Sequence, residues 1–306
     1  MSHLIGFERP LAGNTMLRVH VIAGDRYALL VDTAMRGYEA LVQEALDYVK
    51  QLEVPLAFIV NTHAHHDHIG LNRWVQQRTG ARLAAHDAGR HWIEDADVNY
   101  REFVLGFPQL VADSPALRRE VRETLGEPGK VDLGLRGGEH FYLGGVDVET
   151  LDVSGHMFGE IALVVQQEKT LVLGDALIGL DMPMFHGYVS ASQFRKTLTI
   201  IRDLVLTGRI VRVVSAHLPP LEGQANILAA IDARVAHVDR IEAFLLDITA
   251  FAPRTLKDIW IMLSEAMGKE PEFRGLTMIA NHLHELCDQG RMKLQNGVYQ
   301  RVFDPT

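Results

Sequence analysis

The chain has 306 residues, a formal net charge of −9, 47% hydrophobic residues and 23% charged residues. This composition is that of an ordinary globular protein, and the acidic balance disfavours nonspecific nucleic-acid binding. No apolar run reaches the roughly 18 residues of a membrane helix. The N-terminus also lacks the basic and apolar regions of a secretory signal. We therefore expect a cytoplasmic protein with no membrane contact, and the single cysteine, Cys287, expected as a buried thiol on a helix, agrees with a reducing compartment.

Short apolar runs bounded by Gly, Asp or Asn predict β-strands along the first two-thirds of the chain. They cover residues 17–22, 27–32, 56–61, 82–85, 146–152, 161–166, 170–173 and 210–215. Helical patterns at 38–51, 72–79 and 191–206 alternate with these runs. Strands interleaved with helices predict an α/β class, in which helices cover the sheets.

Residues 87–137 interrupt this alternation with charged, helix-like sequence that carries several aromatic side chains. An insertion of this length between two strands is often a lid over a site. A helical pair that only decorates the surface is the alternative.

The sequence changes character at about residue 224. Helical patterns at 225–248, 255–267 and 276–289 precede a hairpin at 291–302, with Asn296-Gly297 as its type I′ turn. Gly290 is placed to end the last helix. We predict a first domain at 1–223 and a winged-helix-like second domain at 224–306. Acidic side chains outnumber basic ones from residue 239 onward, so packing, pocket formation or dimerisation is favoured over DNA reading.

Residues 63–68 read His-Ala-His-His-Asp-His and follow the apolar run 56–60. Neutral imidazoles and ionised carboxylates are the preferred ligands of zinc and related divalent ions. A solvated His-rich loop is the alternative. Three further apolar runs end at His156, Asp175 and His217. If these strands are neighbours, their ligand-type residues converge on one edge of the fold.

This ordered set resembles the ligands of metallo-β-lactamase fold hydrolases over about residues 10–220. The resemblance implies a four-layer αβ/βα sandwich with two metal ions. It assigns one ion to His63, His65 and His156, the second to Asp67, His68 and His217, and a bridging role to Asp175. In the run 155–159, Met-Phe stands where Thr-Pro is commoner in the family, which alters the loop and not the ligand.

The remaining histidines have weaker claims. We expect His66 beside the ligands or in solvent, and His186 and, less strongly, His86 near the pocket. His282 and His284 are two positions apart on a helix, so they face different ways and form no chelating pair.

Two divalent ions that share a water lower its pKa toward neutrality, and the resulting hydroxide attacks a carbonyl or phosphoryl centre. Asp67 is the predicted catalytic residue, which orients this nucleophile and moves its proton. Zinc is the default ion, and iron and manganese are alternatives.

The leading hypothesis is a hydrolase of a small acyl thioester, because the full ligand set is similar to that of glyoxalase II-like enzymes. A lactone hydrolase is an alternative, although the first tyrosine after Asp175 is the distant Tyr188. The C-terminal extension suggests a metal-dependent ribonuclease as another. An iron redox protein and a non-enzymatic metal-bound interaction module complete the alternatives. Expected partners are a small-molecule substrate and a second copy of the chain, bound through the tail or the inserted helices.

Overall fold

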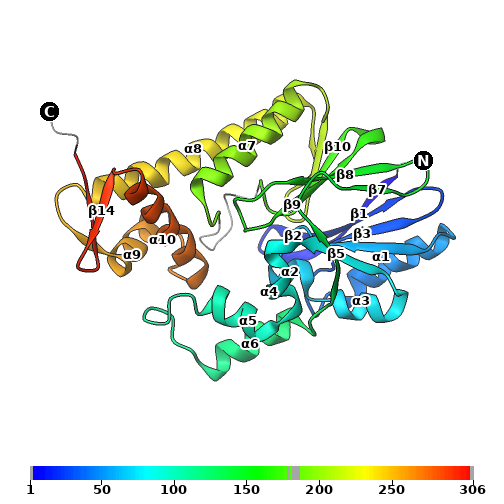
Figure 1. Cartoon of the computed structure of the whole chain (residues 1–306), viewed down its shortest axis with the longest axis horizontal. Coiled ribbons are helices and arrows are strands. Elements are labelled where there is room, and N and C mark those ends of the chain that lie inside the picture. Colours follow the sequence, from blue (N-terminus) through cyan, green and yellow to red (C-terminus); the bar gives the residue numbers. More distant parts are fainter. Residues whose placement is uncertain (1–2, 178–179, 181–186, 304–306) are drawn as a thin grey trace.

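The structure is a computed structural model and describes residues 3–177, 180 and 187–303. Within these residues, two six-stranded sheets face each other and helices cover their outer sides (Figure 1). The first sheet has the order β1 (Leu4–Ala12), β2 (Thr15–Ala23), β3 (Ala28–Val31), β4 (Leu56–Val60), β5 (Arg82–His86), β6 (Val131–Leu135). The second has the order β12 (Leu221–Glu222), β11 (Arg212–Ser215), β10 (Thr170–Leu173), β9 (Ile161–Val165), β8 (Asp147–Asp152), β7 (His140–Tyr142).

Alternating side chains of the central strands divide the apolar interior into layers, because successive residues of a strand point to opposite faces. Leu29 of β3 and Leu163 of β9 belong to the core between the sheets. Leu30 packs on the outer side with α1 (Glu39–Gln51) and α3 (Asn72–Thr79). Val164 packs on the opposite outer side with α7 (Ala191–Leu206) and α8 (Gln224–Ile248). The predicted α/β class and its four-layer sandwich are confirmed.

All eight predicted strands are present in the two six-stranded sheets, but the sequence analysis missed the other four strands of these sheets, β1, β6, β7 and β12. The prediction of a helical insertion at 87–137 is wrong at its end, because the last part of this segment is strand β6, which pairs with β5 in the first sheet. The helical part of this segment comprises η1 (Asp87–Gly89), α4 (Arg90–Glu94), α5 (Ala96–Asn99), the π-helical η2 (Tyr100–Val104) and α6 (Pro115–Leu125).

The C-terminal region contains the three predicted helices and the predicted hairpin. α8 is followed by α9 (Leu256–Ala266) and α10 (Phe273–Asp288), and a small sheet has the order β13 (Arg254–Thr255), β15 (Val298–Arg301), β14 (Met292–Gln295). Asn296 and Gly297 have φ of 52° and 77°, as a type I′ turn requires. Gly290 follows α10 with φ of 71°. Among the helices described, none is long and apolar enough to cross a membrane.

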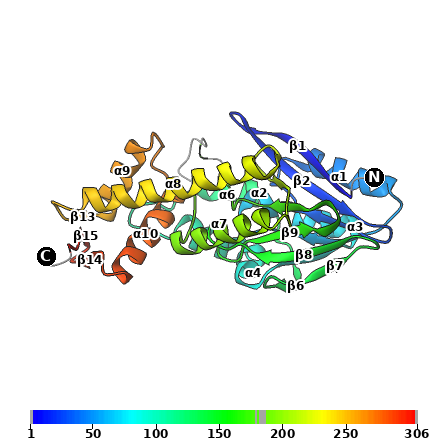
Figure 2. The same ribbon diagram turned by 90° about the horizontal axis from the view of Figure 1, so that it is seen from above.

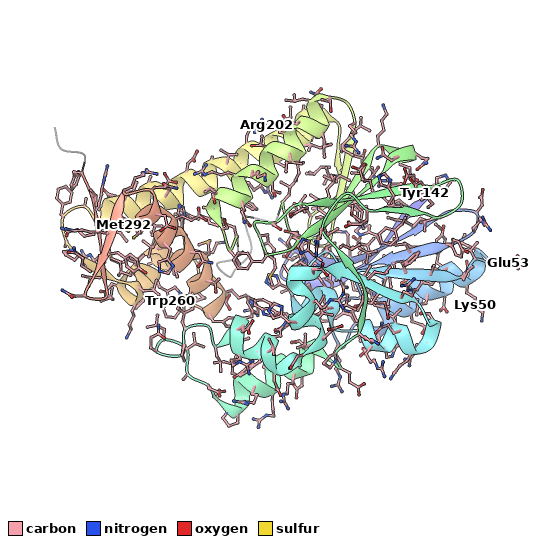
Figure 3. The ribbon with its side chains drawn as sticks, in the orientation of Figure 1. Lys50, Glu53, Tyr142, Arg202, Trp260 and Met292 are labelled. Carbon is pink, nitrogen blue, oxygen red and sulfur yellow. The ribbon has the colours of Figure 1, made fainter. Side chains whose placement is uncertain are left out.

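Helices α9 and α10 and the small sheet lie at the end of the molecule opposite to Lys50 and Glu53 (Figures 1 and 3). Helix α8 runs toward them alongside α7 (Figures 1 and 2). The buried side chains of this C-terminal region share one apolar core with the second sheet: Ile241, Leu263 and Ile279 belong to the same cluster as Val164. The C-terminal helices therefore pack against the rest of the chain. The division into domains 1–223 and 224–306 stays a prediction.

We predict that Leu163→Ala lowers the free energy of unfolding by about 3 kcal/mol, because it leaves a cavity between the sheets. Leu163 is fully buried, whereas Leu206 at the end of α7 is 55% exposed. Leu206→Ala, the matched control, should change stability by less than about 0.5 kcal/mol. Denaturant unfolding of both variants checks this, and equal losses would contradict the assigned core.

Candidate metal centre

The signature loop follows β4 directly. His63 and His65 lie in the turn after the strand, and the one-turn helix α2 (His66–Ile69) carries Asp67 and His68. His68 donates its backbone N–H to the carbonyl of His65, which closes the turn. This compact geometry places four of the predicted ligands close together at the end of β4.

Three strands of the second sheet deliver the other candidates. β8 is antiparallel to β9, β9 is antiparallel to β10, and β10 is parallel to β11, so β8, β10 and β11 run in one direction. His156, Asp175 and His217 follow the carboxyl ends of these strands. The structure therefore brings together all seven residues that the sequence analysis singled out.

A glycine permits the close approach of the two sheets at this edge. A Cβ at Gly174, just before Asp175, would lie 2.4 Å from Thr62 Oγ1 and 2.9 Å from His63 Nδ1. Both distances are shorter than van der Waals contact, so any larger residue here would push Asp175 away from the signature loop.

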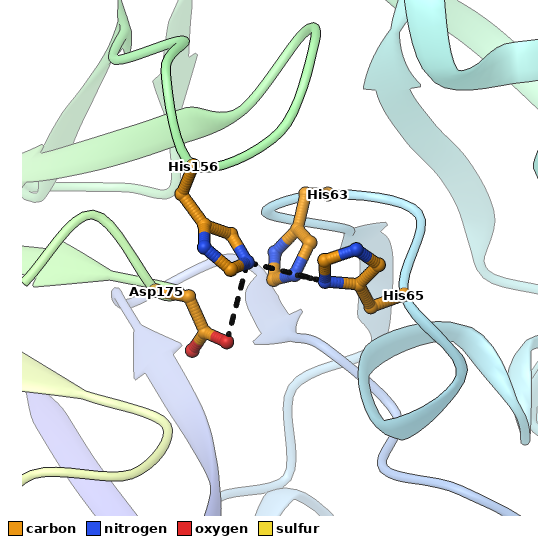
Figure 4. A group of neighbouring side chains, drawn as sticks. All are labelled: His63, His65, His156 and Asp175. Carbon is orange, nitrogen blue, oxygen red and sulfur yellow. Dashed lines mark hydrogen bonds and ion pairs between the residues drawn. The ribbon is translucent and has the colours of Figure 1, made fainter. Parts of the chain in front are cut away.

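One group of candidate ligands consists of His63, His65, His156 and Asp175, all buried (Figure 4). His65 Nδ1 lies 2.9 Å from His63 Nε2 and 3.1 Å from His156 Nε2. His156 Nε2 also lies 3.5 Å from Asp175 Oδ2. Ligands about 2.1 Å from a tetrahedral zinc ion are about 3.4 Å apart, so these spacings are compatible with a metal site.

The second group consists of Asp67, His68 and His217. His217 Nε2 lies 3.1 Å from Asp67 Oδ2, and His68 Nε2 lies 3.8 Å from Asp67 Oδ1. The Asp67 side chain is 27% exposed, whereas His68 is fully buried and His217 is only 3% exposed. Asp67 is thus the member of this group that faces solvent.

Asp175 connects the two groups. Its Oδ2 faces His156, while its Oδ1 lies 3.7 Å from His68 Nε2 and 3.5 Å from His217 Nε2. Each oxygen of this carboxylate is therefore directed to a different group, which is the arrangement that a bridging ligand needs.

Hydrogen bonds from outside the two groups orient the imidazoles. His68 Nδ1 lies 2.8 Å from Asp32 Oδ2, and His217 Nδ1 lies 3.0 Å from the carbonyl oxygen of Met16. Carboxylates and carbonyls only accept, so both Nδ1 atoms carry hydrogen and both Nε2 atoms face the cluster. Such outer contacts fix the tautomer of metal-binding histidines.

The sequence analysis missed Asp32 and Glu160. Asp32 follows β3, has φ of 60°, and also accepts hydrogen bonds from Thr62 N and Oγ1. Its position directly after a buried strand was the sequence feature that could have identified Asp32 as a site residue. Glu160 is fully buried and accepts a hydrogen bond from Asp175 N at 2.7 Å. Burial, and then the charge of Asp175, hold the pKa of Glu160 well above its usual range.

The carboxylates dominate the electrostatics of the second group. Burial lowers the pKa of His68, but Asp32, Asp67 and Asp175 outweigh it and raise the pKa to about 10. Burial likewise lowers the pKa of His217, and Asp175 and Asp67 raise it to about 9. Although burial raises the pKa of Asp67, the neighbouring imidazoles hold it well below its usual range. Before a cation binds, this group therefore holds protons on its histidines.

The donor set fits a divalent cation. His68 Nε2 and Asp175 Oδ1 are buried and make no hydrogen bond within the described part of the chain. Buried polar atoms that lack a hydrogen bond are costly, and a cation would contact both. The His and Asp residues of the cluster are thus able to bind metal ions, and nitrogen and oxygen donors suit zinc, iron or manganese.

The inserted helices pack beside the signature loop. The Phe103 ring of η2 lies 4.8 Å from the His65 ring, and Phe273 of α10 lies 5.5 Å from Phe103. His66 Nε2 lies 2.9 Å from Asn99 Oδ1, so His66 contacts the insertion. Phe103 thus places an apolar ring next to His65, and Phe273 packs on that ring. Opening and closing of this segment stays a prediction.

The other histidines are placed as follows. His282 contacts Tyr188 and His284 contacts Tyr299, so they face different ways as expected. His86 accepts a hydrogen bond from Ala88 N at the start of η1. His186 lies outside the described residues. Cys287 on α10 is only partly buried, which corrects the expectation of a buried thiol.

The family follows from comparison with known proteins. A model of the metallo-beta-lactamase superfamily matches residues 14–217, about two-thirds of the chain and all seven ligand candidates. The chain belongs to this superfamily. Its members include metal-dependent hydrolases, and a hydroxyacylglutathione hydrolase of Methylococcus capsulatus is 26% identical over 260 residues. That match covers 82% of this chain and 83% of the relative.

Solved structures show the same fold. A metallo-beta-lactamase family protein of Thermus thermophilus has a TM-score of 0.74 at 22% identity, covering 98% of this chain and 99% of that one. A beta-lactamase domain protein of Burkholderia ambifaria has a TM-score of 0.71 at 17% identity, covering 98% and 91%. The structural likeness thus extends over the C-terminal helices of this superfamily member.

We predict that metal binding by this superfamily member releases protons. The pKa values of His68 and His217 are about 10 and about 9. A pH of 7.5 lies below both values, so both side chains are protonated until a cation replaces the protons. Zinc added to chelator-treated protein should release about two protons at this group, and the affinity should fall as the pH is lowered. Calorimetric titration in buffers of different ionisation enthalpy measures this release. A heat that is independent of the buffer would contradict it.

Proposed function

We propose that this protein is a dinuclear metallo-hydrolase that cleaves a small acyl thioester. In this proposal His63, His65 and His156 hold one ion, Asp67, His68 and His217 hold the other, and Asp175 bridges them. The observation that carries the proposal is the orientation of the Asp175 carboxylate, whose oxygens face different ligand groups. Zinc is the default ion, with iron and manganese as alternatives.

When bound, a pair of divalent cations lowers the pKa of a water and withdraws charge from the carbonyl oxygen of the substrate. Asp67 is ionised, because His68, His217 and His65 hold its pKa down, and it is the ligand-type side chain open to solvent in its group. Its carboxylate therefore accepts a hydrogen bond from the attacking water and orients it. The same carboxylate then takes the proton.

A thioester suits this arrangement. Thiols have a pKa of about 8.5, so a thiolate leaves without being protonated first. Such a leaving group needs no proton from Asp67, whose pKa the neighbouring imidazoles hold well below its usual range. The Phe103 ring, which lies beside His65 and packs on Phe273, offers apolar contact to a short acyl chain. The hydroxyacylglutathione hydrolase relative supports the thioester class.

The lactone alternative gains no support from Tyr188. Tyr188 is the first tyrosine after Asp175, and its hydroxyl lies 2.9 Å from His282 Nδ1 within the C-terminal core. The ribonuclease alternative still rests on the presence of the C-terminal extension alone, and this extension is acidic.

We predict that His156→Ala abolishes thiol release from short acyl thioesters by the zinc-loaded protein. Loss of a ligand should lower kcat/KM by more than the roughly 100-fold that loss of an outer contact costs. His140→Ala is the matched control, because His140 lies on the edge strand β7 and pairs with Asp147. A panel of acyl chain lengths, followed with a thiol-reactive dye, measures the rates. Full activity of His156→Ala would contradict the proposal.

We also predict that Asp67→Asn lowers kcat by at least about 100-fold and changes KM little. The amide keeps the size of the side chain but removes the charge that accepts the proton, and acid–base catalysis contributes on this scale. Metal content of the purified variant, measured by elemental analysis, separates this loss from loss of the second ion. An unchanged kcat with both ions bound would exclude Asp67 as the proton acceptor.

A further inference from the structure

The segment 187–192 connects the His156 loop to the C-terminal helices. The Gly187 carbonyl oxygen lies 2.8 Å from His156 Nδ1. Because a carbonyl only accepts, His156 donates from Nδ1 and its Nε2 faces the cluster. Val189 N and Ser190 N donate to the carbonyl of Gly155, the residue before His156. The position of this segment therefore sets the orientation of one ligand candidate.

Helix α10 holds the segment in place. Asn281 Nδ2 donates to the Val189 carbonyl at 2.7 Å. Glu285 accepts from Ser190 Oγ at 2.7 Å and from Ser192 N at 2.9 Å. Met278 packs so closely on Gly187 that a Cβ there would lie 3.1 Å from its sulfur. The C-terminal region thus contacts the segment along most of its length.

Tyr188 and His282 form a buried polar pair at the centre of this contact. They are 2% and 1% exposed, and Tyr188 Oη lies 2.9 Å from His282 Nδ1. His282 Nε2 lies 3.5 Å from Glu242 Oε2 on α8, and Glu242 pairs with Arg291 at 2.6 Å. A carboxylate attracts the hydrogen on Nε2, which leaves Nδ1 to accept from the tyrosine hydroxyl.

A polar pair in an apolar core stabilises little compared with apolar side chains of the same shape, but it specifies one geometry. Here that geometry fixes Tyr188, and its neighbour Gly187 carries the carbonyl that orients His156. Direct hydrogen-bond partners of a metal ligand, as the Gly187 carbonyl is to His156, tune metal affinity by about 10- to 100-fold.

We propose that Tyr188 and His282 are positioning residues for the metal centre, through which the C-terminal helices fix His156. The inference rests on the ligand assignment of the proposed function. It gives the C-terminal region a role at the centre: this region adjusts the ligand group that contains His156 and leaves the group of Asp67, His68 and His217 unchanged.

The test compares two tyrosine-to-phenylalanine variants. Tyr188→Phe removes one oxygen and keeps the ring. Tyr299→Phe is the matched control, because Tyr299 lies 3.2 Å from His284 on the same helix, outside the segment 187–192. Zinc affinity is measured by competition with a chromophoric chelator, and His156→Ala identifies which of the two constants belongs to the His156 group. Cobalt(II) absorption reports the coordination geometry.

We expect Tyr188→Phe to weaken the His156 group by about tenfold or more and to alter its cobalt spectrum. The other constant and the melting temperature of the metal-free protein should match those of Tyr299→Phe. His282→Asn, whose side-chain oxygen replaces the Nδ1 acceptor, should restore more affinity than His282→Leu. Unchanged constants, or parallel weakening of both groups, would show that the pair only stabilises the fold.

Failure of the two proposals is distinguishable. If the wild type binds two zinc ions but cleaves no thioester, the proposed reaction fails and the zinc constants still decide the positioning role. If the wild type binds no zinc, the ligand assignment fails. Nitrogen-15 spectra of the histidines then decide: Tyr188→Phe should shift the His156 signal and not the His217 signal, and an unchanged His156 signal overturns the inference.

Discussion

The balance of charge between the buried imidazole of His68 and the carboxylates around it constrains the whole centre. His68 lies within 4 Å of three carboxylates, those of Asp32, Asp67 and Asp175. Buried carboxylates are costly unless positive charge lies beside them. A proton on His68 supplies this charge before a cation binds, and the cation supplies it afterwards. An exchange of protons for a cation would therefore change the local charge little, and the hydrogen bond to Asp32 fixes the orientation of the His68 ring.

The apolar core between the sheets determines where this exchange occurs. Each ligand group combines candidates that follow strands of both sheets, so the distance between the sheets sets the spacing of the candidates within each group. Packed sheets are about 10 Å apart, filled by side chains such as Leu29 and Leu163. The narrow spacing at Gly174 allows Asp175 to reach both groups. Packing far from the chemistry thus controls the geometry of the cluster.

Much of the fold could be predicted because its central strands are buried on both faces and read as continuous apolar runs. β9 and β10 are examples in which every residue is buried. β1 was missed because this edge strand is largely exposed and contains Glu8, Arg9 and Pro10. β6 was missed because Asp132 and Gly134 interrupt its apolar pattern. The local hydrophobic pattern therefore predicts buried strands well and exposed edge strands poorly.

The same limit applies to the centre. Each predicted ligand directly follows an apolar run or lies in the signature, so the local sequence indicated it. Asp32 contacts His68 across 36 positions and Tyr188 contacts His282 across 94. Contacts between such distant positions leave no periodic pattern, and only the folded chain reveals them. The local sequence therefore indicated the candidate ligands but not the residues that orient them.

The 25-residue helix α8 has a consequence for how this chain tolerates changes in length. Its Arg234 donates to the Leu177 carbonyl, two residues after Asp175, while Glu242 contacts Arg291 and His282. Each helical residue adds a rotation of about 100° and a rise of 1.5 Å. One residue inserted between positions 234 and 242 would therefore turn one of these contacts away from its partner. Single-residue insertions and deletions between positions 234 and 242 should therefore destabilise the fold, whereas the exposed turn at Asn296-Gly297 should tolerate them. Changes in chain length should thus be confined to exposed turns and loops.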